Sequence, residues 1–401
     1  MAFSTSPAVI SPLTQFMAES YDDTDLRMPG TGFQAFFARN NPLPTFVDNQ
    51  RGFSYDIVRG SKTISKMLTR EGASRSLGTD AKPNVEMKYQ NHAFVFPTIT
   101  ESNSAEWEQT LERIAGEDAF GSLTREQRFG ILLAKGAKQS MSRAVGRIEK
   151  MAVESLTLGT VTLDDTAGSA YDFDRATTNT FAAPAVWSGA STPLVDLDNL
   201  ARVITQNGGM PPNFVIFGRE VTDAFIRNTT VSGIADNRRY WFIEAGSERS
   251  IAALPPNLQW MIGAGFIHIG NVRTMEGRDF PIFNYLEQYQ TDALVWTDYL
   301  DTKGVFMGNS DAPMNRYFGP SLTIPPTAQE QQQLIQKLGI NPTTGGQMPN
   351  GTAGVVDPRM FRWDFDVPSG AQTSALLRTH TSPIYIPTAV DMFGKITGVV
   401  A

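Results

Sequence analysis

The sequence lacks cysteine altogether and contains only three histidines among its 401 residues. The absence of cysteine excludes disulfides, iron–sulfur clusters, thiolate nucleophiles and cysteine-ligated zinc. His92, His268 and His380 lie far apart, and none has a second histidine at the spacing of a metal site. Ordinary strand residues are therefore the favoured interpretation, and we predict no metal site, no cofactor and no catalytic residue.

Long hydrophobic runs are also missing, because no apolar segment approaches the ~20 residues that a membrane-spanning helix requires. Hydrophobic residues make up 41% of the chain and charged residues 19%, which is typical of a soluble globular protein without a membrane partner. Residues 1–20 contain no lysine or arginine and no continuous apolar core, so we expect no signal peptide and no export. The length predicts two or three subdomains.

Enzyme signatures are absent as well. The sequence has neither a GxSxG nucleophile elbow nor a phosphate-binding Walker loop. The pairs Asp164-Asp165 and Asp172-Asp174 lack the ligand number and the twelve-residue loop of a calcium site, so turn and strand-edge carboxylates are the better interpretation. A net charge of −7 argues against a general nucleic-acid binder, because lysine and arginine supply most of the affinity for a phosphate backbone.

The N-terminal third is rich in turn-forming residues and then alternates. Five prolines break any long helix in residues 1–52, which we predict to be an extended arm with a few apolar anchors. Residues 53–97 alternate polar and apolar side chains around a glycine-containing centre, which predicts a long β-hairpin with a loose tip. This hairpin is net positive. Its basic residues are Arg59, Lys62, Lys66, Arg70, Arg75, Lys82 and Lys88.

An acidic stretch follows the basic hairpin, and residues 103–122 within it have the pattern of a short helix. Adjacent blocks of opposite charge indicate a contact between them. The alternative is that both blocks are solvated faces. Charge alone does not decide between the two, because an isolated surface ion pair contributes only ~0–1 kcal/mol to stability. Two strands alone bury too little apolar surface to be stable, so the hairpin needs a surface to lie on. The acidic residues are Glu101, Glu106, Glu108, Glu112, Glu117 and Asp118.

The strongest helical signal spans Arg125 to about Thr157, and Gly159 is placed to end it. At ~1.5 Å per residue this helix is roughly 48 Å long, which exceeds what a compact domain needs and predicts a spine. Its apolar residues recur every three or four positions, so one face packs and the other meets solvent or a partner. They are Leu133, Ala137, Met141, Ala144, Val145, Ile148, Met151, Ala152 and Leu156.

The remainder predicts a mixed α/β domain. We expect a helix at 196–208 closed by Gly208 or Gly209, then a buried strand at 213–217 and an amphipathic helix. That last helix should place Val221, Phe225 and Ile226 together. Other expected strands lie at 160–163, 170–174, 180–187, 266–272, 280–289 and 303–309, and two final strands surround Pro383 and Pro387.

This order of elements resembles the major capsid proteins of tailed bacteriophages, and most closely the lambda-type major capsid protein E family. The likeness covers roughly residues 50–320 and 372–401 and is one of order and local pattern. The segments that carry it are REQRFGILLAKGAKQSMSRAVGRIEKMAVESLTLGTVTL, YDFDRATTNTF with the downstream Trp187, FVIFGREVTDAFIRN leading to DNRR, GVFMGNSDAPMNRYFG and SPIYIPTAVDMFGKITGVV.

The resemblance implies an α+β Hong Kong 97-like capsid fold in which the basic hairpin lies across the acidic region of a neighbouring subunit. The implied inter-subunit contacts join Lys62, Lys66, Arg70 and Arg75 to Glu101, Glu106, Glu108 and Glu112. The implied domains are an N-terminal arm (1–52), an extended loop (53–97), a peripheral domain (98–189) with the spine helix (125–157), an axial domain (190–320), an insertion (321–371) and C-terminal strands returning to the peripheral and axial domains (372–401).

The implied function is self-assembly as hexamers and pentamers into the icosahedral head shell that encloses the double-stranded DNA genome of a tailed phage. The virion is then its location and the host cytoplasm its place of assembly. Expected partners are other copies of the chain, a separate scaffolding protein, a portal protein, a decoration protein and, weakly and non-specifically, the packaged DNA. An encapsulin-like compartment shell is the alternative within structural proteins. An acid-residue hydrolase using Asp172 and Asp174 is a less favoured one.

Overall fold

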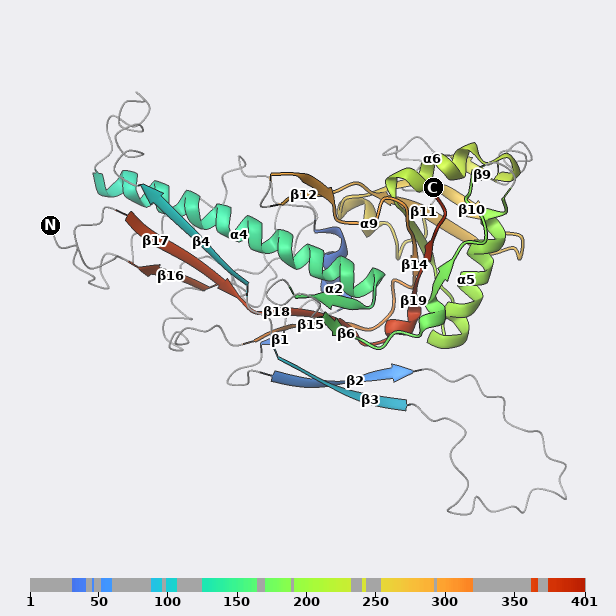
Figure 1. The fold of residues 1–401 in the computed structure, drawn as a ribbon, viewed down its shortest axis with the longest axis horizontal. Helices are drawn as coiled ribbons and strands as arrows, with labels where there is room; N and C mark the ends of the chain where they lie inside the picture. The colour runs from blue at the N-terminus through green and yellow to red at the C-terminus, as the bar shows by residue number, and fades with distance from the viewer. Residues whose placement is uncertain are drawn as a thin grey trace, which may run out of the picture.

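The protein combines one very long helix with a mixed sheet, as Figure 1 shows. Helix α4 (Arg125–Thr157) extends from the sheet that fills the right of the view, and a two-stranded ribbon lies below. The computed structural model describes residues 31–40, 45–46, 52–59, 88–95, 99–106, 125–163, 170–188, 191–231, 240–242, 254–291, 294–319, 362–366 and 374–400.

A seven-stranded sheet forms most of the body, in the order β7-β19-β14-β8-β11-β10-β9. The β8–β11 and β7–β19 pairs are parallel, and the other pairs are antiparallel. The strands span Thr180–Ala182 (β7), Phe214–Phe217 (β8), Tyr240–Phe242 (β9), Phe266–Arg273 (β10), Asp279–Tyr285 (β11), Val305–Gly308 (β14) and Phe393–Thr397 (β19).

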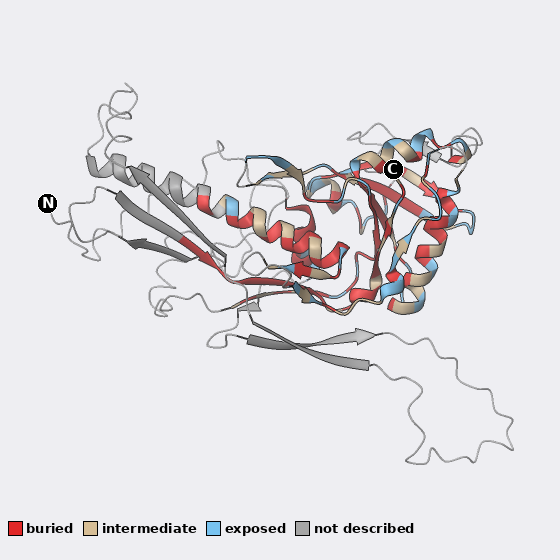
Figure 2. Ribbon diagram, in the orientation of Figure 1, coloured by how far each residue is buried: buried red, intermediate tan, exposed pale blue. Residues whose placement is uncertain are grey.

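Both faces of this sheet are covered, which explains the continuous apolar run Phe-Val-Ile-Phe of the central strand β8. Because side chains alternate along a strand, Phe214 and Ile216 join a hydrophobic cluster that includes α4, whereas Val215 and Phe217 join a second cluster. The second cluster includes residues of α5 (Pro193–Gly208) and α6 (Arg219–Arg227). Figure 2 shows the buried residues of both layers in red.

The long helix begins and ends where the sequence predicts, at Arg125 and Thr157. Gly159 follows it with a positive φ of 73°, a conformation that favours glycine. In the described part of the stripe, Ala144, Val145, Ile148, Met151, Ala152 and Leu156 are buried. The side chains of Leu133, Ala137 and Met141 lie outside the described residues.

Three smaller sheets surround α4. The helix contacts β4 (Ile99–Glu106) and β17 (Ser374–Thr381) of the sheet β16-β17-β4, β18 (Pro383–Pro387) of the sheet β1-β15-β18, and β5 of the pair β5–β6. The C-terminal region thus supplies three strands, β17, β18 and β19, where two were expected. The other strands span Thr45–Phe46 (β1), Thr160–Thr162 (β5), Ala170–Asp172 (β6), Met314–Phe318 (β15) and Arg362–Asp366 (β16).

The prediction of an extended arm over residues 1–52 is wrong for Gly32–Asn40, which forms helix α2. Phe33, Phe36 and Phe37 of this helix are fully buried in the main hydrophobic cluster. Their spacing places them on one side of a helix, so burial of three aromatic rings stabilises a segment only nine residues long. The helix fits between Pro29 and Pro42, which limit its length.

Two further local predictions are also wrong. The short helix expected to begin at Asn103 is strand for Asn103–Glu106, because β4 pairs along its whole length with β17, and this long-range pairing overrides local helix propensity. In α6, Val221 and Phe225 are buried as expected, but Ile226 is 43% exposed. Its position lies one residue beyond the stripe that faces the sheet.

Candidate assembly surfaces

The predicted hairpin is present as an antiparallel ribbon of β2 (Gly52–Arg59) and β3 (Lys88–Val95). The strands pair without a break from Gly52 opposite Val95 to Arg59 opposite Lys88. In Figure 1 this ribbon lies apart from the seven-stranded sheet. The tip residues 60–87, which include Lys62, Lys66, Arg70 and Arg75, lie outside the described residues.

Two of the four predicted acidic contacts belong to strand β4. Glu101 lies opposite Thr379 of β17, and Glu106 lies opposite Ser374. Strand β4 is the last strand of its sheet in the described part of the chain and contacts α4. Glu108 and Glu112 lie outside the described residues. The contact between hairpin and acidic stretch therefore stays a prediction.

A buried carboxylate attaches α2 to α4. Glu149 of α4 is fully buried, and its two oxygens accept hydrogen bonds from the backbone N–H groups of Phe33 (2.7 Å) and Gln34 (3.0 Å). These N–H groups are in the first turn of α2, where no helical partner exists, so Glu149 caps that helix from another element. The side-chain amide of Gln34 also bonds α2 to α4, because it donates to the carbonyl oxygen of Val145 at 3.0 Å.

Strand β11 completes this site. The hydroxyl of Tyr285 donates to Oε1 of Glu149 at 2.6 Å and accepts from the N–H of Gly32 at 3.4 Å. Burial raises the pKa of Glu149 to about 7, although the hydrogen bonds from Tyr285, Phe33 and Gln34 oppose the shift. Burial, and then the neighbouring Glu149, raise the pKa of Tyr285 well above 10, so the phenol stays protonated and donates.

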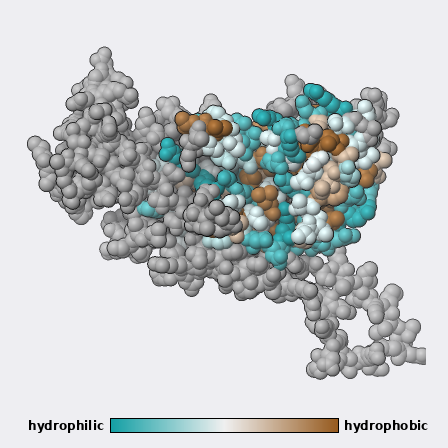
Figure 3. Space-filling model, in the orientation of Figure 1, coloured by the Kyte–Doolittle hydropathy of each residue, from teal (hydrophilic) through white to brown (hydrophobic). Residues whose placement is uncertain are grey.

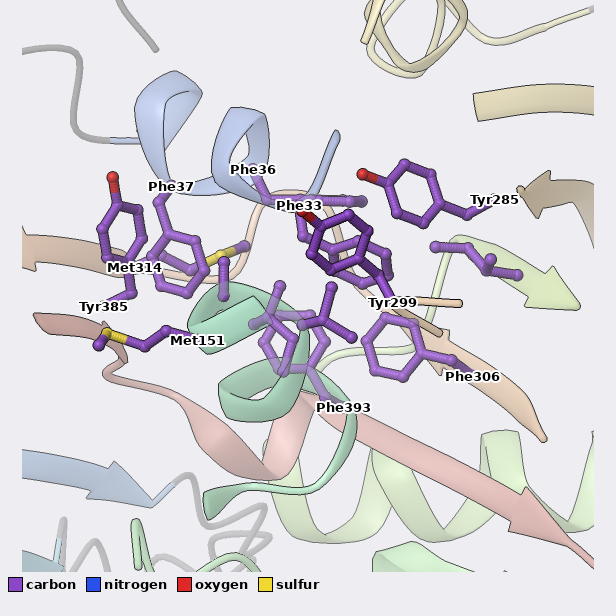
Figure 4. Close-up of a cluster of buried hydrophobic side chains, with 14 of the residues drawn as sticks. Phe33, Phe36, Phe37, Met151, Tyr285, Tyr299, Phe306, Met314, Tyr385 and Phe393 are labelled. Carbon is purple, nitrogen blue, oxygen red and sulfur yellow. The ribbon is translucent and has the colours of Figure 1, made fainter. Parts of the chain in front are cut away.

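Aromatic packing supports the same attachment, as Figure 4 shows. Phe33 meets Tyr285 edge-on with ring centroids 5.1 Å apart, and Phe37 meets Tyr385 of β18 in the same way at 5.0 Å. Phe36 lies edge-on to Trp260 at 4.7 Å. Helix α2 is therefore held simultaneously against α4, the seven-stranded sheet and the smaller sheet that contains β18.

The C-terminal end of α4 is fixed by a partly buried arginine. Arg175 donates to the carbonyl oxygen of Leu156 at 3.2 Å, which satisfies one of the free carbonyls at the helix end. Burial lowers the pKa of Arg175 to about 10, while Asp391 and Asp172 oppose the shift. Asp391 also accepts the N–H of Ala176 at 2.7 Å. The spine helix is thus tied at this end to the segment that leads into β19.

Asp172 and Asp174, the pair considered for an acid-residue hydrolase, lie in a turn at the end of β6. The N–H of Asp174 donates to Oδ1 of Asp172 at 2.8 Å, and Asp174 itself has a φ of 53°. Such a side-chain-to-backbone bond is typical of a turn at a strand end. All three histidines lie on strands, with His268 and His380 buried and His92 in β3. Among the described residues no cluster could hold a metal ion, and no helix is long and apolar enough to cross a membrane.

Glu149 is the residue that sequence reasoning missed. It follows the buried Ile148 directly and lies one turn after the buried Val145, so it stands at the edge of the stripe predicted to pack. A carboxylate at such a position needs hydrogen-bond partners from another element, which is the signal that could have identified it. The partners themselves, two backbone N–H groups near residue 33, carry no side-chain signature.

Comparison with known proteins gives one matching family and several solved structures of similar fold. A model described as phage major capsid protein E matches residues 73–335. A crystal structure described as a prophage capsid protein from E.coli CFT073 is 14% identical, with all of both chains covered and a TM-score of 0.59. A phage-related protein from Bordetella bronchiseptica RB50 is 11% identical over 97% of this chain and 96% of its own, with a TM-score of 0.43. The SrpI encapsulin from Synechococcus elongatus PCC 7942 is 12% identical over 95% and 94%, with a TM-score of 0.40. No curated protein matches the sequence.

Proposed function

This chain belongs to the phage major capsid protein E family, and on that premise we propose that its subunits assemble as hexamers and pentamers into an icosahedral head enclosing a double-stranded DNA genome. The chain is a capsid shell protein with a Hong Kong 97-like fold, it associates with further copies of itself in the virion, and it is not an enzyme. The observation that carries the finer proposal is the β2–β3 ribbon, which lies apart from the seven-stranded sheet and, as two strands alone, buries too little apolar surface to be stable without a further surface to lie on.

The domain assignment is part of the proposal. We assign residues 98–189 to a peripheral domain around α4 and residues 190–320 to an axial domain. The seven-stranded sheet supports the second assignment, since five of its strands, β8, β9, β10, β11 and β14, fall within 190–320. The arm (1–52), extended loop (53–97), insertion (321–371) and C-terminal strands (372–401) complete the division. Helix α2 makes part of the arm an integral core element.

The hairpin is proposed to lie on a neighbouring subunit. Lys62, Lys66, Arg70 and Arg75 then approach the carboxylates of Glu101, Glu106, Glu108 and Glu112 in another chain. Each pair contributes a few tenths to ~1 kcal/mol, but the contacts repeat at every subunit and form together when a shell closes. The position of Glu101 and Glu106 on β4 supports this proposal, because a strand beside the spine helix is a rigid platform.

Further partners follow from the same role. We propose a separate scaffolding protein, a portal protein, a decoration protein and weak non-specific contact with packaged DNA, with assembly in the host cytoplasm. The net charge of −7 supports weak contact, since DNA that is driven in and later ejected should not adhere strongly to the inner wall.

The test is assembly of the purified chain, with and without a scaffold, examined by electron microscopy. Closed shells built from six-fold and five-fold clusters are expected, and nuclease-protected DNA in particles from infected cells distinguishes a phage head from a compartment that holds protein. A chain that sediments only as a folded monomer under all salt and scaffold conditions would refute the proposal.

Charge reversal tests the hairpin contact. Changing Lys66→Glu and Arg70→Glu should impair assembly while the subunit stays folded, and Glu106→Lys with Glu108→Lys should partly restore it. High salt should weaken the parent contact, because the Debye length is only ~8 Å at physiological ionic strength. If the double reversal assembles as well as the parent at low salt, the hairpin is held by backbone pairing and apolar anchors instead.

A further inference from the structure

A small second hairpin leaves the body beside the spine helix. Strands β12 (Gln288–Gln290) and β13 (Trp296–Asp298) pair antiparallel, and the segment follows directly on β11 of the main sheet. Its base is anchored. Gln288 donates to Asp298 at 2.8 Å, the rings of Tyr289 and Tyr299 lie 4.9 Å apart, and the amine of Lys150 on α4 lies 5.6 Å from the ring centre of Tyr289. The hairpin therefore has a fixed base on the core.

Three described residues at the tip of this hairpin are apolar and exposed. Leu294, Val295 and Trp296 are consecutive and are 73%, 58% and 65% exposed. Together these three residues expose on the order of 400 Å² of surface, which is comparable to the largest patches on monomeric proteins, and such patches are often functional. Figure 3 shows a hydrophobic patch in brown at the position of this hairpin.

The backbone conformation at the tip determines how these residues are exposed. Leu294 has a φ of 59°, and it is one of only two non-glycine residues with positive φ in the described part of the chain. This left-handed conformation is unfavourable for a bulky side chain, and glycine or asparagine would adopt it more readily. The leucine is mostly exposed, so packing within the subunit offers little to offset the strain. Hydrogen bonds from the N–H of Leu294 to the carbonyl oxygen of Thr291 and from the N–H of Thr291 to that of Val295 hold this turn, so the hairpin loop itself keeps the leucine exposed.

We propose that the β12–β13 tip, formed by Leu294, Val295 and Trp296, packs against a neighbouring copy of this chain in the assembled shell. This inference rests on the proposed assembly into hexamers and pentamers. A standard interface buries roughly 800 Å² on each partner, so a patch of about half that area is too small to hold an isolated dimer. It suits one contact among several in a shell, where each subunit meets many neighbours.

A single introduced cysteine tests the contact directly, because the parent chain has none. Val295→Cys supplies the probe, and Met275→Cys is the matched control, since Met275 lies in the β10–β11 turn and is 63% exposed. The maleimide-labelling rate of Cys at 295 should fall at least tenfold when purified subunits assemble, while the rate at 275 changes less than threefold. Equal rates at 295 in subunits and shells would overturn the proposal.

The other outcomes are distinguishable. If shells form and 295 stays reactive until phosphatidylcholine vesicles are added, the tip binds lipid and the proposal is wrong. If the parent chain forms no shells at all, the proposed assembly fails and the tip contact fails with it. Equal protection at 295 and 275 would show a general effect of enclosure and would also overturn the proposal.

Leu294→Gly separates assembly from stability. Glycine relieves the positive φ, so the unfolding midpoint of the free subunit should stay the same or rise, while the protein concentration needed for assembly should rise at least tenfold. Met275→Gly is the control and should assemble at the parent concentration. A Leu294→Gly chain that is equally stable and assembles normally would show that the tip makes no inter-subunit contact.

Discussion

Replacing Glu149 by glutamine should remove a large pH dependence from the stability of the subunit. The pKa of Glu149 is raised from 4.5 to about 7 by burial, so between these values the folded chain binds a proton that the unfolded chain has released. Stability from this group is therefore complete below pH 4.5 and is lost as the pH rises through 7. A change from 4.5 to 7 corresponds to about 3 kcal/mol.

The neighbouring phenols do not obscure this titration. The pKa values of Tyr285, Tyr299 and Tyr385 are all raised above 10, in each case first by burial, so these phenols stay neutral across the range. Glutamine cannot ionise, although its amide offers only one acceptor where the carboxylate serves two backbone N–H groups. The variant should thus be less stable than the parent at low pH and should lose less stability as the pH rises.

Urea unfolding of unassembled subunits between pH 4.5 and 8.5, at fixed ionic strength, measures the effect. The free energy of unfolding of the parent minus that of Glu149→Gln should fall by about 3 kcal/mol over this range. Glu154→Gln removes the same charge from the same helix at a partly exposed position and is the control for loss of a carboxylate from α4. A parent-minus-variant difference that stays constant, or grows with pH, would show that Glu149 ionises normally in the folded chain.

Three other predictions concern buried positions. Ile148→Asp places an unpaired charge on the packed face of α4 and should cost roughly 3–5 kcal/mol, giving insoluble expression; normal particles would show that the stripe does not pack as described. Phe36→Ala should destabilise the subunit by about 3–5 kcal/mol and increase proteolysis near α2, whereas truncation of the exposed Ile226 to alanine should change the unfolding midpoint little. Asn228→Ala should cost about 1–3 kcal/mol, because the buried amide donates to Trp187 and accepts from the N–H groups of Thr230 and Val231; an unchanged urea midpoint would contradict this.

Local patterns predicted the elements whose stability is local. The three- and four-residue apolar spacing located α4 to the residue, and the run Phe214–Phe217 identified the central strand, because these signals come from burial of one stripe or both faces. Strand β4 could not be predicted, since its partner β17 lies more than two hundred and fifty residues further along the chain. Helix α2 did leave a signal in its three phenylalanines, but the prolines around it favoured an extended interpretation.

The candidate surfaces also divide into features that the local sequence predicts and features that depend on the tertiary fold. The ribbon β2–β3 followed from alternation, which is a property of the segment itself. The cap that Glu149 provides for α2 did not, because it depends on backbone N–H groups brought together only by the tertiary fold. The exposed tip at Leu294 was likewise invisible, since an apolar triplet beside a strand is read as core until the structure places it outside.

The three C-terminal strands have a consequence for the timing of folding. Strands β17, β18 and β19 follow one another within residues 374–397, yet each enters a different sheet, and β19 lies between β7 and β14 inside the largest one. A ribosome must therefore synthesise nearly four hundred residues before any of these sheets gains its last strand, and a nascent chain still lacks a finished core when its arm and hairpin have already emerged. A chain truncated before β19 should therefore leave the largest sheet open between β7 and β14, and we expect it not to yield stable subunits.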